Sequence, residues 1–207
     1  MEGVPSRVEG TTGYETDVDR FAATSRGLAF EHVCADFLPF LPDAPRRVLD
    51  AGAGVGQNAA ALARRGHHVV AAEPLRAFLD RARADYAHLS IEWTLDALPA
   101  LERVRAGAEP FAFVLVEGVW HHLDPDEQTE AVDTLADLLA PGGHAALSLR
   151  HGPPGLGTHV FPTDAARTIE RARDRGLDCA YRAEGLPSLL PGKEDVSWSR
   201  VVLSKAP

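Results

Sequence analysis

A glycine-rich stretch between an apolar segment and a helix-like segment most strongly constrains how this chain can fold. Residues 48–57 read Val-Leu-Asp-Ala-Gly-Ala-Gly-Val-Gly-Gln, and residues compatible with a helix follow at once. We interpret the stretch as a buried strand, a tight turn and the start of a helix. Glycine has no Cβ atom, so the backbone of such a turn can approach a bound molecule, and the first N–H groups of a helix are free to contact it. The turn is therefore expected to bind a ligand.

The spacing of the glycines restricts the class of ligand. A turn that wraps the pyrophosphate of a dinucleotide has a third glycine three residues after the second. Here the glycines are at positions 52, 54 and 56, and Gln57 occupies the position of that third glycine. Asp50 is expected to point its carboxylate into the turn, where it would favour a cationic or hydroxyl-bearing group and repel a phosphate. The ligand need not be a diphosphate.

Apolar runs and helix-like segments alternate along the rest of the chain. The apolar runs predict strands at 47–51, 68–73, 90–94, 111–116, 144–149, 177–183 and 197–203. Helices are predicted from the glycine turn to residue 66, at 75–86, at 98–105, from 124 to a Pro-Gly-Gly stop at 141–143, and at 164–175. This alternation predicts an α/β fold with a doubly wound, mostly parallel seven-stranded sheet. The last two strands have no helix between them, so we expect a C-terminal antiparallel hairpin.

The predicted helix after residue 124 has the clearest start signal in the chain. Asp124 can cap it, Pro125 fits the first turn, and Glu127 can complete a capping box. Apolar residues then recur at helical spacing and form a predicted core face, at Ala131, Val132, Leu135, Leu138 and Leu139.

Two segments outside this alternation are expected to border the ligand. Residues 1–42 are interpreted as a mobile arm up to Glu15 followed by a helix over 17–40 that covers the sheet. Residues 152–163 form a long loop rich in glycine and proline, of the kind that often serves as a lid or a binding loop. Arg150, His151 and His159 flank or lie in this loop. We expect residues 1–207 to form a single domain.

Composition excludes several functional classes. The chain has 207 residues, 45% of them hydrophobic, and a formal net charge of −9, which disfavours binding along a nucleic-acid backbone. No apolar run approaches the length of a membrane span, and residues 1–13 are unlike a signal peptide. Cys34 and Cys179 have no metal or redox spacing, so we interpret them as free thiols in a reducing, cytoplasmic compartment.

A hydrophobic strand followed by Asp and Gly-x-Gly-x-Gly resembles the first motif of the class I S-adenosylmethionine-dependent methyltransferases. The resemblance extends from about Val48 to Leu149 and includes ordered motifs on consecutive strands. It implies a Rossmann-like methyltransferase domain with S-adenosylmethionine as cofactor. The fold implied by the resemblance includes the same antiparallel ending of the sheet.

The resemblance also implies roles for individual residues. Glu73 lies about twenty residues after the first glycine, where an acid accepts hydrogen bonds from both ribose hydroxyls; a solvated loop acid is the alternative. Asp96 would accept from the adenine amine; alternatively, it caps a helix. Tyr14, with Arg20, would fold over the cofactor and touch its carboxylate. The full implied cofactor site comprises Tyr14, Asp50, Gly52, Gly54, Gly56, Glu73, Pro74, Asp96, Ala97, Leu98 and Glu117.

The segment after the fourth strand, Glu117 to His122, lies where this family places its reacting groups. It lacks an Asn-Pro-Pro-Tyr run, a Pro-Cys pair and a glutamate pair suited to arginine. His121 or His122 could accept a proton from an oxygen or nitrogen nucleophile, with a rate that rises near pH 6.5 unless the site shifts the pKa. The alternative is that one histidine packs against the sheet and the other caps a loop. Adjacent histidines without a carboxylate do not suggest a metal site.

The sequence therefore predicts a methyltransferase that acts on a small-molecule or peptide acceptor at oxygen or nitrogen. A protein methyltransferase would have an open groove in place of an enclosed pocket. A protein that binds S-adenosylmethionine without turnover is a second alternative. A nicotinamide-dependent oxidoreductase is disfavoured by Gln57 and Asp50.

Overall fold

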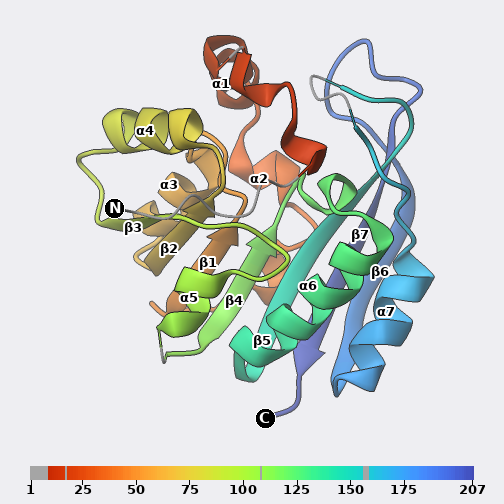
Figure 1. The fold of residues 1–207 in the computed structure, drawn as a ribbon. Coiled ribbons are helices and arrows are strands. Elements are labelled where there is room, and N and C mark those ends of the chain that lie inside the picture. Colours follow the sequence, from red (N-terminus) through yellow and green to blue (C-terminus); the bar gives the residue numbers. More distant parts are fainter. Residues whose placement is uncertain (1–8, 17, 108, 156–158) are drawn as a thin grey trace.

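The computed structural model describes residues 9–16, 18–107, 109–155 and 159–207 (Figure 1). These residues form a seven-stranded sheet in the order β3-β2-β1-β4-β5-β7-β6. Its strands are β1 Arg47–Ala51, β2 His68–Glu73, β3 Ile91–Leu95, β4 Phe111–Val116, β5 Leu139–His151, β6 Leu177–Pro187 and β7 Ser197–Lys205. Strand β7 is antiparallel to β5 and β6, and the remaining pairs are parallel. This confirms the predicted sheet and its C-terminal hairpin.

Parallel pairing brings the carboxyl ends of several strands to one edge of the sheet. Asp50 of β1 pairs with Ala71 of β2 and Leu115 of β4. Glu73, at the end of β2, pairs with Leu95 at the end of β3. The turns that follow these strands therefore start from neighbouring points, which is where open α/β sheets bind ligands.

Helices cover both faces of the sheet (Figure 1). They are α1 Val18–Arg26, α2 Phe30–Val33, α3 Gln57–Arg64, α4 Arg76–Asp85, α5 Glu102–Ala106, α6 Pro125–Leu138 and α7 Ala165–Asp174, with short 3-10 turns η1 Glu9–Thr11, η2 Tyr14–Thr16, η3 Leu38–Phe40 and η4 Trp120–His122. Helices α5, α6 and α7 bury their apolar side chains on one face. Helices α2 and α3 do so on the other. None of the helices in the described ranges is long and apolar enough to cross a membrane.

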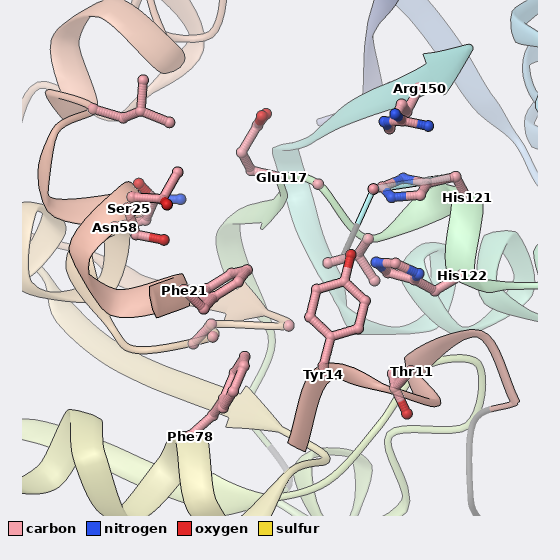
Figure 2. Close-up of a pocket in the computed structure, with 18 of the residues that line it drawn as sticks. Thr11, Tyr14, Phe21, Ser25, Asn58, Phe78, Glu117, His121, His122 and Arg150 are labelled. Carbon is pink, nitrogen blue, oxygen red and sulfur yellow. The ribbon is translucent and has the colours of Figure 1, made fainter. Parts of the chain in front are cut away.

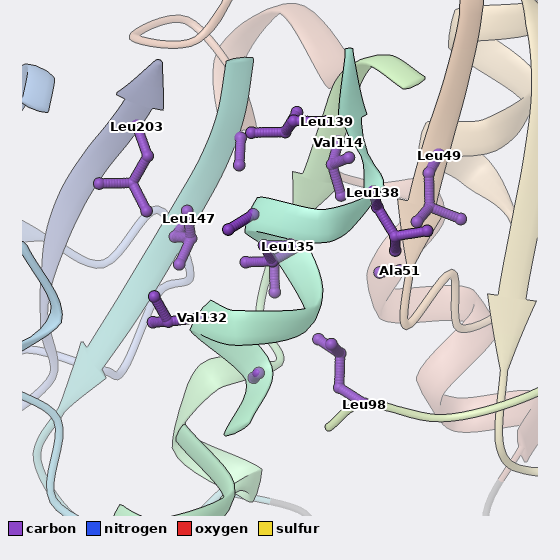
Figure 3. Close-up of a cluster of buried hydrophobic side chains, with 14 of the residues drawn as sticks. Leu49, Ala51, Leu98, Val114, Val132, Leu135, Leu138, Leu139, Leu147 and Leu203 are labelled. Atoms are coloured by element: carbon purple, nitrogen blue, oxygen red, sulfur yellow. The ribbon is translucent and has the colours of Figure 1, made fainter. Parts of the chain in front are cut away.

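Helix α6 forms the centre of the larger core cluster (Figure 3). Leu135 is fully buried, and Val132 is 1% exposed. They share this cluster with Val114 of β4, Leu147 of β5 and Leu203 of β7. Removal of apolar area from water stabilises a fold by about 25 cal/mol per Å², so this contact ties the parallel strands to the terminal hairpin. The predicted core face of the helix is confirmed for Ala131, Val132, Leu135 and Leu138; Leu139 is also buried but begins β5.

The predicted capping box of α6 is present. The Asp124 side chain accepts hydrogen bonds from the backbone N–H groups of Asp126 and Glu127, both at 2.8 Å. The Glu127 side chain in turn accepts from the Asp124 N–H at 2.8 Å. Because η4 ends two residues earlier, this cap also fixes the path of the segment that carries His121 and His122.

The N-terminal segment differs from its prediction. The helix expected over 17–40 is divided into α1, α2 and η3. The chain turns at Gly27, and Leu38 and Pro39 are the first two residues of the 3-10 turn η3. Residues 1–8 of the expected mobile arm and residue 17 lie outside the described residues. Within the described part of the arm, Gly10 packs so closely on His122 that an added Cβ would clash with the His122 backbone. The described part of the arm is therefore packed against the segment that carries His122.

Two further predicted elements are displaced. The Pro141-Gly142-Gly143 stop lies inside β5, because α6 already ends at Leu138. The extra residues form an irregularity in the β4–β5 pairing between Phe111 and Phe113, consistent with a bulge. The helix expected at 98–105 starts only at residue 102, after a left-handed conformation at Leu101 with φ of 46°.

Candidate active site

A cavity of about 600 Å³ lies at the carboxyl ends of the parallel strands (Figure 2). The turns after β1, β2, β3 and β4 form its floor, and η1, η2 and α1 border it. On one side Figure 2 shows Phe21, Ser25, Asn58 and Phe78, and on the other Tyr14, His121, His122 and Arg150. The cavity therefore has two chemically different halves.

The three glycines of the β1–α3 turn have different surroundings. All have positive φ, of 83°, 58° and 87° at Gly52, Gly54 and Gly56, which explains the residue type. A Cβ at Gly52 would clash with Val119, and a Cβ at Gly56 would clash with Trp93. Gly52 and Gly54 line the cavity, whereas Gly56 does not. Gly56 thus serves the packing of the strand–helix unit.

Glu73 joins two turns of the cavity floor. Its side chain accepts hydrogen bonds from the N–H of Gly54 at 2.8 Å and from the N–H of Leu75 at 2.9 Å. Burial raises the pKa of Glu73 to about 7, although these two hydrogen bonds favour the ionised form. Each carboxylate oxygen can accept more than one hydrogen bond, so Glu73 can hold the turns and still accept from a ligand in the cavity.

Asp50 and Asp96 have carboxylates that do not line the cavity in the described structure. Asp50 is 1% exposed and contacts the N–H of Ala59 in α3, and burial raises its pKa to about 7. The Asp96 carboxylate accepts from the N–H groups of Ala97, Arg103 and Val104. It therefore holds the first turn of α5, as in the helix-cap alternative, and the adjacent Ala97 and Leu98 line the cavity instead.

Glu117 lines the cavity and forms a buried ion pair that the sequence did not reveal. Its Oε2 lies 2.7 Å from Nη1 of Arg200, and the two side chains are 11% and 8% exposed. Arg200 also donates to the carbonyl oxygen of Val33 at 3.3 Å. Burial raises the pKa of Glu117, while Arg200 opposes this shift. The pair joins residues 83 positions apart, and no local motif could have predicted it.

His121 and His122 are buried, 4% and 8% exposed, with ring centroids 4.1 Å apart. Nδ1 of each ring has no hydrogen-bond partner among the residues that the structure describes. Burial lowers the pKa of His121 well below its usual range and that of His122 to about 4, although a hydrogen bond to the Gly10 backbone favours the charged form of His122. Both imidazoles are thus neutral at pH 7 and can accept a proton. The described residues contain no group of three side chains suited to a metal.

The connection between β6 and β7 lines the cavity and was missed by the sequence analysis. It contributes Ser188, Leu190, Pro191, Lys193 and Val196, and Trp198 follows in β7. No motif marks this segment; only the hairpin geometry brings it to the carboxyl edge of the sheet.

The described part of the loop expected at 152–163 contacts the site, since the N–H of Phe161 donates to the carbonyl oxygen of His121 at 2.9 Å. Gly155 lines the cavity, and residues 156–158 lie outside the described residues. Of the flanking side chains, Arg150 reaches the cavity. His151 instead contacts Ser199 at 2.8 Å, and His159 stacks near Phe161.

The sequence of this chain is similar to those of known methyltransferases. Residues 48–143 match a family described as "Methyltransferase domain". An uncharacterized methyltransferase of Mycobacterium tuberculosis is 37% identical over 107 residues, covering 52% of this chain and 41% of the relative. A second from the same organism is 36% identical over 111 residues, covering 51% and 54%. The matched region thus spans only about half or less of these curated relatives.

Solved structures share the fold at low sequence identity. The 1,6-didemethyltoxoflavin-N1-methyltransferase of Burkholderia thailandensis, with bound 1,6-didemethyltoxoflavin and S-adenosylhomocysteine, has a TM-score of 0.73 and 19% identity, covering 97% of this chain and 88% of that one. A TehB-like methyltransferase from Corynebacterium glutamicum has a TM-score of 0.64 and 20% identity, with coverage of 92% and 98%. Residues 48–143 therefore match a methyltransferase domain in sequence, and the fold of the described residues is that of class I S-adenosylmethionine-dependent methyltransferases.

The buried Glu117–Arg200 pair generates a stability prediction. Arg200→Met should leave the Glu117 carboxylate buried without its counterion and lower the free energy of unfolding by about 3–5 kcal/mol. The double variant with Glu117→Gln should recover part of this loss. Urea unfolding measures both. Arg182→Met is the control, since its ion pair with Glu184 is 43% and 49% exposed and should contribute at most about 1 kcal/mol. Equal losses for Arg200→Met and the control would contradict a structural role for the buried pair.

Proposed function

We propose that this protein transfers the methyl group of S-adenosylmethionine to a small-molecule or peptide acceptor, at oxygen or nitrogen. The observation that carries the proposal is the single cavity of about 600 Å³, with the glycine turn and Glu73 in one half and the His121–His122 pair in the other. Cavities of this size are typical of cofactor and substrate sites. In this proposal residues 1–207 form one domain. Residues 1–42 form its N-terminal arm and cover, and the loop of residues 152–163 lies beside the acceptor.

The residues present fit this cofactor. Glu73 offers buried acceptor oxygens to the ribose hydroxyls, with Pro74 beside it. Ala97 and Leu98 offer an apolar edge to the adenine, and Asp96 supports them through α5. Gly52 and Gly54 leave room along the turn, and Asp50 and Gly56 support that turn from beneath. Arg20, Asn58 and Glu117 border the remaining part of the cofactor half. Tyr14 lies at the boundary of the two halves, with its ring near those of Phe21 and His122.

Bound S-adenosylmethionine supplies a methyl group that its sulfonium charge already activates. The protein's contribution is then to position the acceptor and exclude water. Tyr14, from the N-terminal cover, packs at 5.2 Å on the His122 ring and closes the cavity beside the histidines. A neutral imidazole there can take the proton that the acceptor loses. A concave site of this volume suits a small molecule or the end of a peptide.

Ligand binding tests this proposal directly. S-adenosylmethionine and S-adenosylhomocysteine should bind at low-micromolar affinity or tighter, about −8 kcal/mol. Glu73→Ala should weaken both ligands, because each has a ribose. Titration calorimetry measures the affinities, and Glu92→Ala on the exposed side of β3 is the matched control. Heat of binding with NAD but with neither of these ligands would sink the proposal. Release of labelled methyl product from cell extracts separates an enzyme from a binding protein without turnover.

The raised pKa of Glu73 predicts pH-dependent binding. Ribose hydroxyls donate to the ionised carboxylate, so ligand binding requires loss of the proton that Glu73 holds below about pH 7. The affinity should therefore fall about tenfold from about pH 8 to about pH 6. The ligand 5′-methylthioadenosine is the suitable probe, because it has the ribose and adenine but no titrating amino-acid part. Glu73→Gln should bind it more weakly and without this pH dependence; a flat wild-type profile would contradict the assigned contact.

The histidine pair makes a kinetic prediction once an acceptor is identified. If His121 or His122 is the base, its replacement by Ala should lower kcat about 100-fold while S-adenosylhomocysteine affinity is kept. Because the pKa of His122 is about 4 and that of His121 is also depressed, the rate should be flat above about pH 6, not rise near 6.5. His68→Ala, at the exposed start of β2, is the control. Unchanged turnover in both variants would assign the pair to packing alone.

A further inference from the structure

Two arginines of this protein are equally buried but differ in their partners. Arg150 and Arg200 are each 7% exposed. Arg200 has a carboxylate, Glu117, at 2.7 Å. Arg150 donates from Nη1 to the carbonyl oxygen of Gly152 at 3.3 Å, and no ion pair involves it in the described parts of the chain. Since a buried cation without a counterion is costly, the Arg150 guanidinium is a binding group that lacks its partner.

The guanidinium of Arg150 faces the cavity beside the histidines (Figure 2). Burial lowers its pKa, while Asp195 and Tyr14 act on it electrostatically in the opposite direction. Asp195 is exposed to solvent and forms no ion pair with Arg150 within the described ranges, so it does not replace a buried counterion. The charge is therefore available to a molecule in the cavity.

The positive charge of Arg150 favours an anion, and the residues around it do so as well. Lys193 lines the same cavity from the β6–β7 connection. The acids that line the cavity are Glu73, in the cofactor half, and Glu117, which Arg200 already neutralises. Trp198, opposite Arg150 in the β5–β7 pairing, lies with its ring 6.0 Å from that of His121 and provides an aromatic wall.

We propose that the methyl acceptor is a small carboxylic acid whose carboxylate pairs with Arg150 and whose apolar or aromatic body packs on Trp198. This inference rests on the proposed function and deepens it. A planar guanidinium matches a carboxylate with two parallel hydrogen bonds. Lys193 is only partly buried, so Arg150 is the buried cation that an acceptor must balance. A carboxylate has a single charge that matches it, whereas a phosphate monoester has a charge of about −1.5 to −2 at pH 7.

To test this proposal, the binding of several acids is compared with that of their amides, with the full chain saturated with S-adenosylhomocysteine. The probes are 4-hydroxybenzoate, indole-3-carboxylate and hexanoate, each compared with its primary amide, which keeps the shape and removes the charge. At least one acid should bind about tenfold more tightly than its amide in calorimetry. Equal affinities for every pair, or no binding of any acid, would overturn the proposal, and this comparison in the wild type needs no variant to fold.

Variants of Arg150 then test whether its guanidinium is the group that recognises the carboxylate. Arg150→Gln should remove the preference for the acid while S-adenosylhomocysteine affinity is kept, and Arg150→Lys should retain part of it. Arg167→Gln, an exposed arginine on α7, makes the same charge change away from the cavity and should keep the full preference. If Arg150→Gln instead weakens S-adenosylhomocysteine and leaves the preference intact, the residue binds the cofactor and the proposal is wrong.

Different outcomes would overturn the proposed function and the proposed acceptor class. Absence of S-adenosylhomocysteine binding by the wild-type protein would overturn the proposed function. Binding of S-adenosylhomocysteine without any preference for acids over amides would overturn only the assignment of the acceptor class.

Discussion

Parallel pairing of β1, β2 and β4 is the constraint on which the rest of this structure depends. The hydrogen-bond ladder sets the ends of these strands side by side, so the turns after them begin at fixed neighbouring points. The glycine turn, Glu73 and Glu117 are thereby brought to one edge of the sheet. Glu73 then joins the first two turns, since it accepts from the N–H groups of Gly54 and Leu75. The cofactor half of the cavity is consequently part of the rigid scaffold.

Charge is distributed unevenly across the cavity. Glu73, Glu117 and Arg20 line the half assigned to a cofactor with a sulfonium cation, and Arg150 lies beside the histidines in the other half. Lys193 also lines the cavity. Arg200 makes the burial of Glu117 possible because it supplies the opposite charge within the sheet. An acceptor with a negative charge would complete this arrangement and would approach the cationic cofactor with favourable electrostatics.

The proposed acceptor half is bordered in part by segments outside the parallel strands and the turns that follow them. Tyr14 comes from the N-terminal cover, and Leu190, Lys193 and Trp198 come from the terminal hairpin. Such segments can vary without disturbing the parallel strands, because they contribute little to the core of the sheet. Related folds with similar cofactor sites can therefore accept different molecules.

Local pattern was sufficient to predict the strands and the α6 cap. Apolar runs over 47–51, 68–73 and 111–116 form strands because two-sided burial requires such runs, and the Asp124–Glu127 cap is satisfied within three residues of chain. The role of Asp96 was open at this level, since a capping acid and a ligand-binding acid have the same local sequence. Its bonds to the backbone N–H groups of Arg103 and Val104 appear only once α5 is in place.

Long-range contacts determine the features of the site that local sequence pattern does not predict. The Glu117–Arg200 pair, the contact of Gly10 with His122 and the approach of the β6–β7 connection to the cavity join residues far apart in the chain. The charge states of the histidines and of Glu73 depend on burial, which no residue type reveals. Sequence pattern encodes periodicity and neighbouring hydrogen bonds; solvent exclusion and the pairing of distant charges exist only after the chain has packed.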